Sequence, residues 1–291
     1  MLRLEKISKT YQKKNLFGQL QAQVHALKDV NLTIQTGECL GLVGESGSGK
    51  STLGKVILGL EQATDGKLYY KEQEVDDKLR EELSRRRAFQ IIFQDPSSAM
   101  NPHLSALSIV AEPLLLVYPK AEALKRARAI LQEMGFRSAD LSKKPNEFSG
   151  GQKQRIVIAR AIALDPEFVV CDEPVSALDV SIQAQIINLL MRLQKDKHLT
   201  YLFISHDLAM VRSISQRVAV MYQGQLVELA PTEAIFSNPQ HAYTKRLLSA
   251  IPIADPKRAK QRRLNGDGAE LTPIQLGTKW LEVEPGHGVL V

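Results

Sequence analysis

Residues 44–51, with the sequence GESGSGKS, have the types and spacing to hold a phosphate group. They follow an apolar run over 39–43, precede a stretch with helical spacing, and fit the pattern G-x-x-x-x-G-K-[ST]. Glycines let successive backbone N–H groups turn toward phosphate oxygens, and a helix N-terminus adds a favourable dipole. Lys50 would reach the β- and γ-phosphates, and the Ser51 hydroxyl would face Mg²⁺. A flexible glycine and serine loop is the alternative, but the strand before it and the helix after it favour a nucleotide site. The predicted site comprises Gly44, Glu45, Ser46, Gly47, Ser48, Gly49, Lys50, Ser51 and Thr52.

Two adjacent acids, Asp172 and Glu173, end a second apolar run at 168–171. Successive side chains at a strand end point in different directions, so one acid can face a metal ion and the other a water molecule. We assign Asp172 to Mg²⁺ and Glu173 to the general base that polarises the attacking water. Taken alone, such a pair is more typical of a turn or a cap. Its position after a phosphate loop favours the catalytic interpretation.

The sequence SGGQ at 149–152 precedes another stretch with apolar residues at helical spacing. Ser149 could simply cap that helix, with the glycines in a tight turn. A serine hydroxyl and unshielded glycine amides at a helix start could also form a second anion site. If both sites bind one triphosphate, the simplest arrangement is two subunits head to tail, each supplying the half that the other lacks. The residues of this second site would be Ser149, Gly150, Gly151 and Gln152.

The elements that must position these residues show a period that switches between strand-like and helix-like, which is typical of an α/β domain. Strands are expected at 30–36, 39–43, 89–93, 168–171, 201–204, 217–221 and 225–229, and helices at 50–60, 106–135, 149–164 and 180–195. The helical stretch at 106–135 interrupts a sheet that resumes later, which predicts an inserted subdomain. Gln223-Gly224 predicts a hairpin turn. Past Pro252 the sequence becomes polar and basic, so we expect a loosely packed appendage.

The composition is that of a globular protein, with 44% apolar and 24% charged residues among 291. This excludes a collagen, a coiled coil or a wholly disordered chain. The 38 Lys and Arg exceed the 32 Asp and Glu by only six, which is too diluted an excess to predict a nucleic-acid partner. Cys39 and Cys171 each lie in an apolar run and are typical of buried residues in a reducing compartment. With no apolar leader and no apolar run of about 18–20 residues, we expect a cytosolic protein.

The phosphate loop, the SGGQ segment and the strand ending in Asp172-Glu173, in that order, resemble the ATP-binding subunit of an ABC transporter. The resemblance covers residues 1 to about 252. It implies an α/β P-loop nucleoside-triphosphatase with an N-terminal antiparallel β subdomain, a RecA-like core and an inserted α-helical subdomain at about 100–146. The ATPase domain would then be 1–252, and the appendage 253–291.

The resemblance also implies roles for residues outside these motifs. Gln94 in FQDP resembles the Q-loop glutamine, which touches Mg²⁺ and the water and relays nucleotide state to the transmembrane partner. His206 in ISHD resembles the switch histidine, which contacts the γ-phosphate. Tyr11 resembles the aromatic residue that stacks on adenine, and an ordinary tyrosine at a strand end is the alternative.

Three sets of candidate residues result from the motifs and the resemblance together. The catalytic set is Lys50, Gln94, Glu173 and His206. The Mg²⁺ set is Ser51, Gln94 and Asp172. The set that resembles the D-loop at a dimer seam is Ser176, Ala177, Leu178 and Asp179. The implied cofactors are ATP and Mg²⁺.

Three longer segments, 94–102, 175–190 and 238–252, are similar to the dipeptide, oligopeptide and nickel importer group. This similarity implies an ATP-hydrolysing subunit that powers peptide import at the cytoplasmic face of the cell membrane, with a nickel or metal-chelate importer as the alternative. The implied partners are a paralogous ATPase subunit in a heterodimer, or a second copy in a homodimer, two permease subunits and, indirectly, an external binding protein. No nucleic-acid partner is implied.

Two readings from other classes explain the sequence less well. A soluble ABC ATPase of DNA repair or translation usually carries two nucleotide domains or a long coiled coil, whereas this chain has one phosphate loop and no sustained heptads. A P-loop kinase or GTPase explains neither SGGQ nor ISHD.

The C-terminal part departs from the importer group in one respect. Many of its members have a cysteine-rich extension that can hold an iron–sulfur cluster, but no cysteine follows Pro252 here, so we predict no cluster. The basic run at 257–263 is expected to be a solvated tail, with contact to lipid headgroups or permease loops as the alternative.

Overall fold

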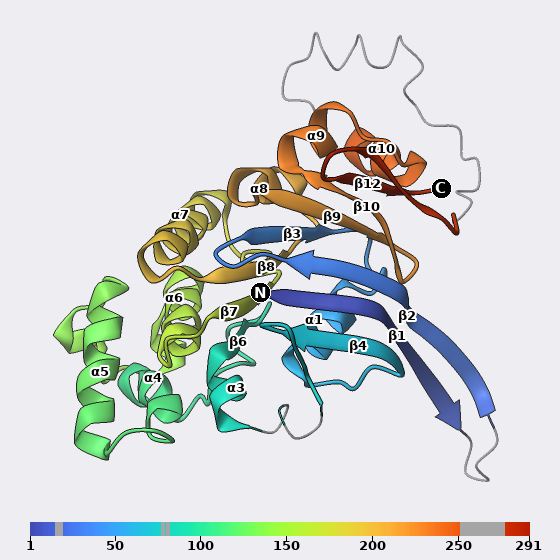
Figure 1. Ribbon diagram of the computed structural model, residues 1–291. Helices are drawn as coiled ribbons and strands as arrows, with labels where there is room; N and C mark the ends of the chain where they lie inside the picture. The colour runs from blue at the N-terminus through green and yellow to red at the C-terminus, as the bar shows by residue number, and fades with distance from the viewer. Residues whose placement is uncertain (15–19, 77–78, 80–81, 251–276) are drawn as a thin grey trace, which may run out of the picture.

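A computed structural model of the chain describes residues 1–14, 20–76, 79, 82–250 and 277–291. Its described part contains a four-stranded and an eight-stranded sheet, with helices around the larger one (Figure 1). The strands are β1 (Leu2–Lys14), β2 (Leu20–Ile34), β3 (Cys39–Val43), β4 (Asp65–Tyr70), β5 (Gln73–Glu74), β6 (Phe89–Ile92), β7 (Phe168–Asp172), β8 (Thr200–Ile204), β9 (Arg217–Tyr222), β10 (Gln225–Pro231), β11 (Trp280–Glu284) and β12 (His287–Leu290). The α-helices are α1 (Lys50–Leu58), α3 (Leu83–Ala88), α4 (Ala106–Leu114), α5 (Lys120–Glu133), α6 (Gly150–Ile162), α7 (Val180–Lys197), α8 (Leu208–Ile214), α9 (Thr232–Ser237) and α10 (Ala242–Ser249).

The larger sheet has the order β11-β12-β10-β9-β3-β8-β7-β6, and its strands from β9 to β6 run parallel. The smaller sheet, β2-β1-β4-β5, is antiparallel. Parallel strands place their carboxyl ends at one edge of a sheet. The phosphate loop follows β3, Gln94 follows β6, Asp172-Glu173 end β7 and His206 follows β8. The topology therefore brings the predicted site residues to the same edge.

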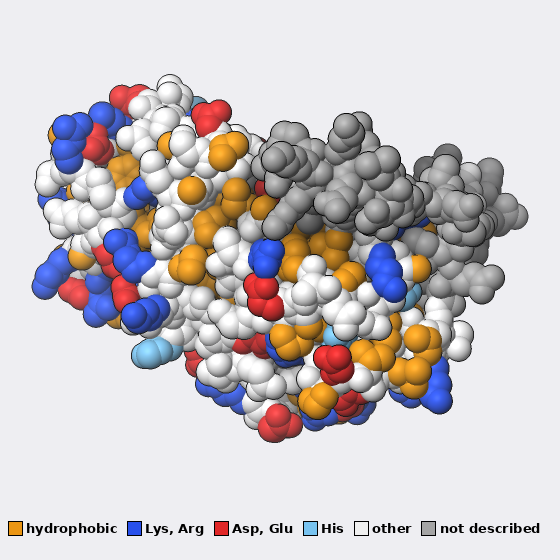
Figure 2. All heavy atoms as spheres, turned by 90° about the horizontal axis from the view of Figure 1, so that it is seen from above, with side chains coloured by type: hydrophobic (Ala, Val, Ile, Leu, Met, Phe, Trp, Pro, Cys, Tyr) orange, Lys and Arg blue, Asp and Glu red, His pale blue; other side chains and the backbone are white. Residues whose placement is uncertain are grey.

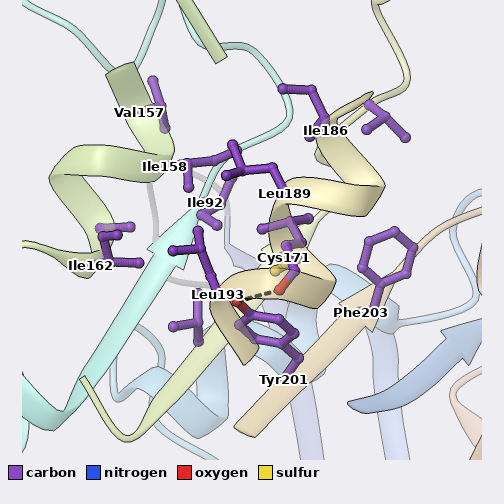
Figure 3. Packing of buried hydrophobic residues seen from close by; sticks show 14 of the residues in the cluster. Ile92, Val157, Ile158, Ile162, Cys171, Ile186, Leu189, Leu193, Tyr201 and Phe203 are labelled. Carbon is purple, nitrogen blue, oxygen red and sulfur yellow. Dashed lines mark hydrogen bonds between the residues drawn. The ribbon is translucent and has the colours of Figure 1, made fainter. Parts of the chain in front are cut away.

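The parallel strands are buried on both faces, as β7 illustrates. Val169 and Cys171 belong to an apolar cluster with α6 and α7, whereas Phe168 and Val170 belong to a second cluster with α1 and the small sheet. A strand that is covered on both faces has no polar alternation, which explains the continuous apolar run in the sequence. Figure 3 shows the first cluster around Cys171, where the buried Tyr201 hydroxyl donates a hydrogen bond to a carbonyl oxygen of α7 at 3.2 Å.

The inserted helical region between β6 and α6 contains two α-helices, α4 and α5, and two short 3₁₀ helices at Ser138–Asp140 and Pro145–Glu147, where the sequence predicted one stretch. Pro119 stands at the N-cap of α5 and has no N–H to continue a helix from α4. Because a residue before proline avoids the helical region, Tyr118 does not lead into α5 as helix, and α4 has already ended at Leu114. Both helices lie at the end of the molecule away from the small sheet (Figure 1).

The C-terminal residues correct one prediction. The expected loosely packed appendage is wrong for the end of the chain, because β12 pairs with β10 and extends the large sheet, with β11 outside it. His287 at the start of β12 is buried, and the turn before it uses Gly286 with φ of +76°. Residues 251–276, which include the basic run at 257–263, lie outside the described residues.

The β9–β10 connection is the hairpin turn that the sequence predicted. Gln223 and Gly224 both have positive φ, +47° and +83°, which is the conformation of a tight two-residue hairpin turn. By contrast, β2 begins at Leu20, well before the expected strand, and pairs with β1 along most of its length.

Seen from above, Lys and Arg side chains intermingle with Asp and Glu over the helical end of the molecule (Figure 2). Both signs of charge therefore share this face, in keeping with the modest formal charge of +6. None of the helices in the described ranges combines the length and apolar character that a membrane-spanning helix requires.

Candidate nucleotide-binding site

The phosphate loop between β3 and α1 depends on glycine at two close approaches. Gly44 and Gly49 have φ of +151° and +105°, in which other residues are strained. A Cβ atom on Gly44 would lie 2.2 Å from the Met221 carbonyl oxygen, and one on Gly49 would lie 2.5 Å from that of Ala26. The loop is thus pressed against β2 and the end of β9, and only glycine fits at these positions.

Lys50, the first residue of α1, folds back into the loop. Its Nζ donates hydrogen bonds to the carbonyl oxygens of Gly44 and Glu45, both at 2.7 Å. Burial lowers the pKa of Lys50, and the carboxylates of Glu173 and Asp172 partly oppose that shift. The ammonium group is therefore held at the centre of the loop, within reach of an anion bound there.

Ser51 and Asp172 form the second part of the site. The Ser51 hydroxyl donates a hydrogen bond to Asp172 Oδ1 at 3.1 Å. Burial raises the pKa of Asp172, and the hydrogen bond from Ser51 counteracts part of this rise. Hydroxyl and carboxylate oxygens are ligands that Mg²⁺ accepts, and this ion usually completes its shell with water and substrate phosphates. The donor set fits a magnesium ion beside the phosphate loop.

No group of three or more His, Cys, Asp or Glu side chains within the described residues is arranged to hold a metal ion by itself. The prediction that the chain carries no iron–sulfur cluster stays a prediction.

The third part of the site is the carboxylate of Glu173 with the two side chains that contact it. The Gln94 amide donates to Glu173 Oε2 at 2.9 Å, and His206 Nδ1 lies 3.2 Å from the same oxygen. Glu173 has φ of +48°, in the left-handed region, and its N–H donates to the carbonyl oxygen of Ile204 on β8. This sharp turn directs Glu173 toward Gln94 and His206 while Asp172 faces Ser51, so the two carboxylates diverge as the sequence predicted.

A cavity of about 590 Å³ joins these parts. Its lining residues are Val24, His25, Ala26, Ser46, Gly47, Gly49, Lys50, Ser51, Thr52, Gln94, Glu173 and His206. All four predicted catalytic residues therefore face one cavity. Residues 24–26 of β2 were not predicted to line the site, because no strand was expected at these positions. Their alternation of apolar and polar residues is too short to have indicated a site.

Tyr11 is not part of that lining. It pairs with Val24 across the β1–β2 ladder, its side chain is 38% exposed, and the ammonium of Lys9 lies 5.0 Å from its ring centroid. Val24, rather than Tyr11, reaches the cavity in this structure. The role of Tyr11 in stacking on adenine stays a prediction.

The SGGQ segment forms the start of α6, apart from the cavity. Ser149 is the N-cap: its Oγ accepts from the Gln152 N–H at 3.4 Å, and Gln152 Oε1 accepts from the Ser149 N–H at 3.0 Å. This reciprocal pair is a capping box. Ser149, Gly150 and Gln152 are exposed, and none of the four residues lines the cavity of the same chain.

The segment 176–179 connects the end of β7 to α7. The Ser176 hydroxyl donates to the Glu173 carbonyl oxygen at 3.2 Å, and Asp179 is the N-cap residue of α7. A Cβ atom on Gly150 would lie 3.2 Å from Leu178, so this segment also packs against the start of α6. It therefore links the backbone of Glu173 to the SGGQ segment.

A glycine-rich loop between a parallel strand and a helix, with carboxylates at the end of a neighbouring strand, defines a P-loop nucleoside-triphosphatase. Residues 27–176 match the family model described as ABC transporter, and residues 227–280 match the model described as Oligopeptide/dipeptide transporter, C-terminal region. The chain belongs to the ABC transporter family and is an ATP-binding protein with ATPase activity of that class.

Two curated relatives illustrate the similarity. The chain is 46% identical to the oligopeptide transport ATP-binding protein OppF of Bacillus subtilis (strain 168), over 98% of this chain and 96% of that protein. It is also 46% identical to the glutathione import ATP-binding protein GsiA of Salmonella paratyphi A, over 86% of this chain. The alignment spans only 40% of GsiA, so the comparison covers less than half of that longer protein.

Solved structures confirm the fold. The ATP-binding cassette MJ0796, in a dimeric post-hydrolysis state bound to ADP and Pi, has a TM-score of 0.69 and 32% identity, covering 80% of this chain and 99% of that one. The cbiO1 subunit of the cbiONQ transporter from Clostridium perfringens has a TM-score of 0.71 and 25% identity, covering 90% of this chain and 98% of that one. The predicted fold class and ATP binding are confirmed.

Proposed function

We propose that the chain is the ATP-hydrolysing subunit of an importer for dipeptides and oligopeptides. Its likeness to OppF extends over nearly the whole of both chains, and its C-terminal region matches the oligopeptide and dipeptide family. The likeness to GsiA, which is named for the import of glutathione, a tripeptide, supports the same class of cargo. A nickel or metal-chelate importer has no comparable support among these relatives.

The predicted catalytic and Mg²⁺ residues have roles in this proposal that follow from their contacts. The loop amides and Lys50 bind the phosphates, and the carboxylate of Glu173 accepts a proton from the attacking water. Gln94 and His206 orient Glu173 through its Oε2 atom. Ser51, Asp172 and Gln94 would hold Mg²⁺, which supplies charge neutralisation at the phosphates when it is bound.

The proposal also requires a second ATPase subunit. Ser149, Gly150 and Gln152 are exposed and lie outside the cavity of their own chain, so they are available to the phosphates held by a partner. The likeness to MJ0796, whose structure is described as dimeric, supports this arrangement. We propose a paralogous partner subunit, two permease subunits contacted through the region 100–146 and Gln94, and a position at the cytoplasmic face of the membrane.

The observation that carries the proposal is the meeting of Gln94, Glu173 and His206 beside the phosphate loop. The test is to reconstitute the chain in proteoliposomes with permease, partner ATPase and binding-protein subunits of a peptide importer. We expect ATP hydrolysis to rise when the binding protein carries a peptide. Stimulation of ATP hydrolysis by a nickel chelate instead of a peptide would contradict the proposed cargo. ATP hydrolysis at the full rate by a solitary monomer would contradict the two-subunit mechanism.

A further inference from the structure

Helix α10 contacts the phosphate loop although it lies about 200 residues further along the chain. The Glu45 N–H donates a hydrogen bond to the Tyr243 hydroxyl at 2.8 Å. Arg246, one turn later, places Nη2 3.4 Å from Glu45 Oε1. The second residue of the phosphate loop is therefore held by α10 through both its backbone and its side chain.

The Tyr243 ring has one fixed position. It is fully buried and stacks on Tyr222 of β9, with the ring centroids 4.2 Å apart and the planes at 30°. Its own N–H donates to Nδ1 of His241, the N-cap of α10, at 3.1 Å. Burial raises the pKa of Tyr243 to about 12, so the phenol remains neutral near pH 7. The hydroxyl is thus a fixed acceptor aimed at the Glu45 N–H.

Glu45 is also tied to the binding machinery through its carbonyl group, which belongs to the next peptide unit along the chain. Its carbonyl oxygen accepts from Lys50 Nζ at 2.7 Å and from the Ser48 N–H at 3.2 Å. Tyr243 holds the N–H side of Glu45, and Lys50 is held by the carbonyl side. A shift of Tyr243 would therefore change the orientation of the loop segment that places the Lys50 ammonium.

The contacts continue from α10 to the C-terminal hairpin, β11–β12. Glu228 of β10 is completely buried and accepts from the N–H groups of Gln240 at 2.7 Å and His241 at 3.0 Å. His287 Nε2 of β12 lies 2.8 Å from Glu228 Oε1. One carboxylate thus joins the start of α10 to the start of β12, which lie close together in Figure 1.

We propose that Tyr243 is a positioning residue for the phosphate loop, through which the C-terminal hairpin sets the affinity of this loop for ATP. The inference rests on the proposed role of residues 44–51 in binding the phosphates. It assigns a function in the ATPase cycle to residues that follow the ABC transporter match at 27–176.

The first experiment removes one oxygen atom. Tyr243→Phe retains the stack on Tyr222 but loses the acceptor for Glu45, so the Kd of the full chain for mant-ATP should rise about fivefold, the effect of one ordinary hydrogen bond. The kcat at saturating ATP should stay within about twofold, because Glu173 and its partners are untouched. Tyr222→Phe is the matched control, since it removes the other hydroxyl of the stacked pair and should leave Kd unchanged.

Two results would overturn the positioning role. One is a Kd for Tyr243→Phe that is equal to or below that of the wild type. The other is an equal rise in Tyr222→Phe, which would show that the stacked pair acts only through general packing. Lys50→Ala separates the inference from the proposed function. If Lys50→Ala loses ATP binding while the Kd of Tyr243→Phe stays at the wild-type value, only the inference is rejected. Normal ATP binding in Lys50→Ala would instead reject the role of residues 44–51 in binding the phosphates.

A double-mutant cycle tests the connection to the hairpin. His287→Leu removes the one partner of Glu228 that comes from the hairpin and should raise the Kd for mant-ATP by about twofold to threefold in the wild-type background. The same change should not raise the Kd further in Tyr243→Phe, because that variant already lacks the hydrogen bond between α10 and Glu45. Additive effects of the two substitutions, or no effect of His287→Leu in the wild type, would overturn the route from the hairpin to the loop.

Discussion

Two helices of this protein, α1 and α6, have glycine at or next to their N-cap, and their first turns are arranged in opposite ways. At α1, the N-cap is Gly49 in the left-handed region, and no side chain caps the helix. At α6, Ser149 and Gln152 cap each other's backbone N–H groups. The start of α1 faces a cavity beside three catalytic candidates, whereas the start of α6 lies on the surface.

This difference indicates that the two sites depend differently on a ligand. The first N–H groups of a helix have no partner within it, and at α1 none is supplied by a capping side chain. An anion is therefore the natural partner of the α1 amides. The capping box of α6 stabilises that helix without a ligand, and its exposed Ser149 hydroxyl can still contact a phosphate held by a second subunit. Glu173→Gln and Ser149→Ala each affect one side of this contrast.

The largest effect, on ATP hydrolysis, is expected from Glu173→Gln in the cavity that the start of α1 faces. The amide cannot accept a proton from water, so kcat for ATP hydrolysis should fall roughly a thousandfold, within the range of general-base catalysis. ATP binding should be retained, because Lys50 and the loop are unchanged. Measured turnover and mant-ATP titration of the same preparation check both points.

Glu233→Gln is the matched control for that substitution. Glu233 is an exposed carboxylate that pairs with Arg212 and does not line the cavity, so its loss should leave turnover at the wild-type value. Unchanged hydrolysis in Glu173→Gln would contradict the general-base assignment.

An intermediate effect is expected at the α6 side, from Ser149→Ala. Loss of the cap should lower the free energy of unfolding by about 1 kcal/mol. Ser105→Ala is the control, because Ser105 caps α4 in the same way, accepting from the Ser108 N–H at 3.2 Å. If Ser149 also contacts phosphate in a partner's site, only Ser149→Ala should lower the hydrolysis rate of the assembled transporter, by about tenfold. Equal rates in the two variants would show that Ser149 is a structural cap alone.

The phosphate loop and the start of α1 could be predicted from the sequence because the patterns that indicate them are local. A buried parallel strand followed by a glycine-rich turn fixes where the loop lies, and the same argument located Asp172 and Glu173 at the end of β7. Parallel pairing then brings Gln94 and His206 to the same edge. The expected divergence of the two carboxylates followed from strand geometry, and the structure realises it through the left-handed φ of Glu173.

Features that depend on pairing between distant segments were not predictable in this way. The β11–β12 hairpin is positioned by its ladder with β10 and by the burial of His287 against Glu228. Neither contact can be inferred from the local sequence at 280–291. Tyr243 was noted only within a family-like segment, and nothing in its spacing indicates that its hydroxyl would meet Glu45. Long-range hydrogen bonds of this kind become visible only when the fold is known.

The smallest effect is expected where α10 begins, from the titration of His241. Burial lowers its pKa from the usual 6.5, although the neighbouring Glu228 opposes the shift, and His287 contacts the same carboxylate. The unfolded chain therefore binds a proton that the folded protein does not bind until lower pH. The free energy of unfolding should fall as the pH drops below about 6.5, by at most about 1.4 kcal/mol per pH unit from this group.

Chemical denaturation of His241→Asn tests that assignment between pH 5 and 7. Asparagine is a favourable N-cap that can accept from the Tyr243 N–H, yet it has no proton to gain in this range. The variant should therefore lose part of the acid-side decline in stability while keeping the contact between Tyr243 and Glu45. An identical decline in the variant and the wild type would assign the pH dependence to other groups. It would mean that the His241 imidazole does not titrate between pH 5 and 7.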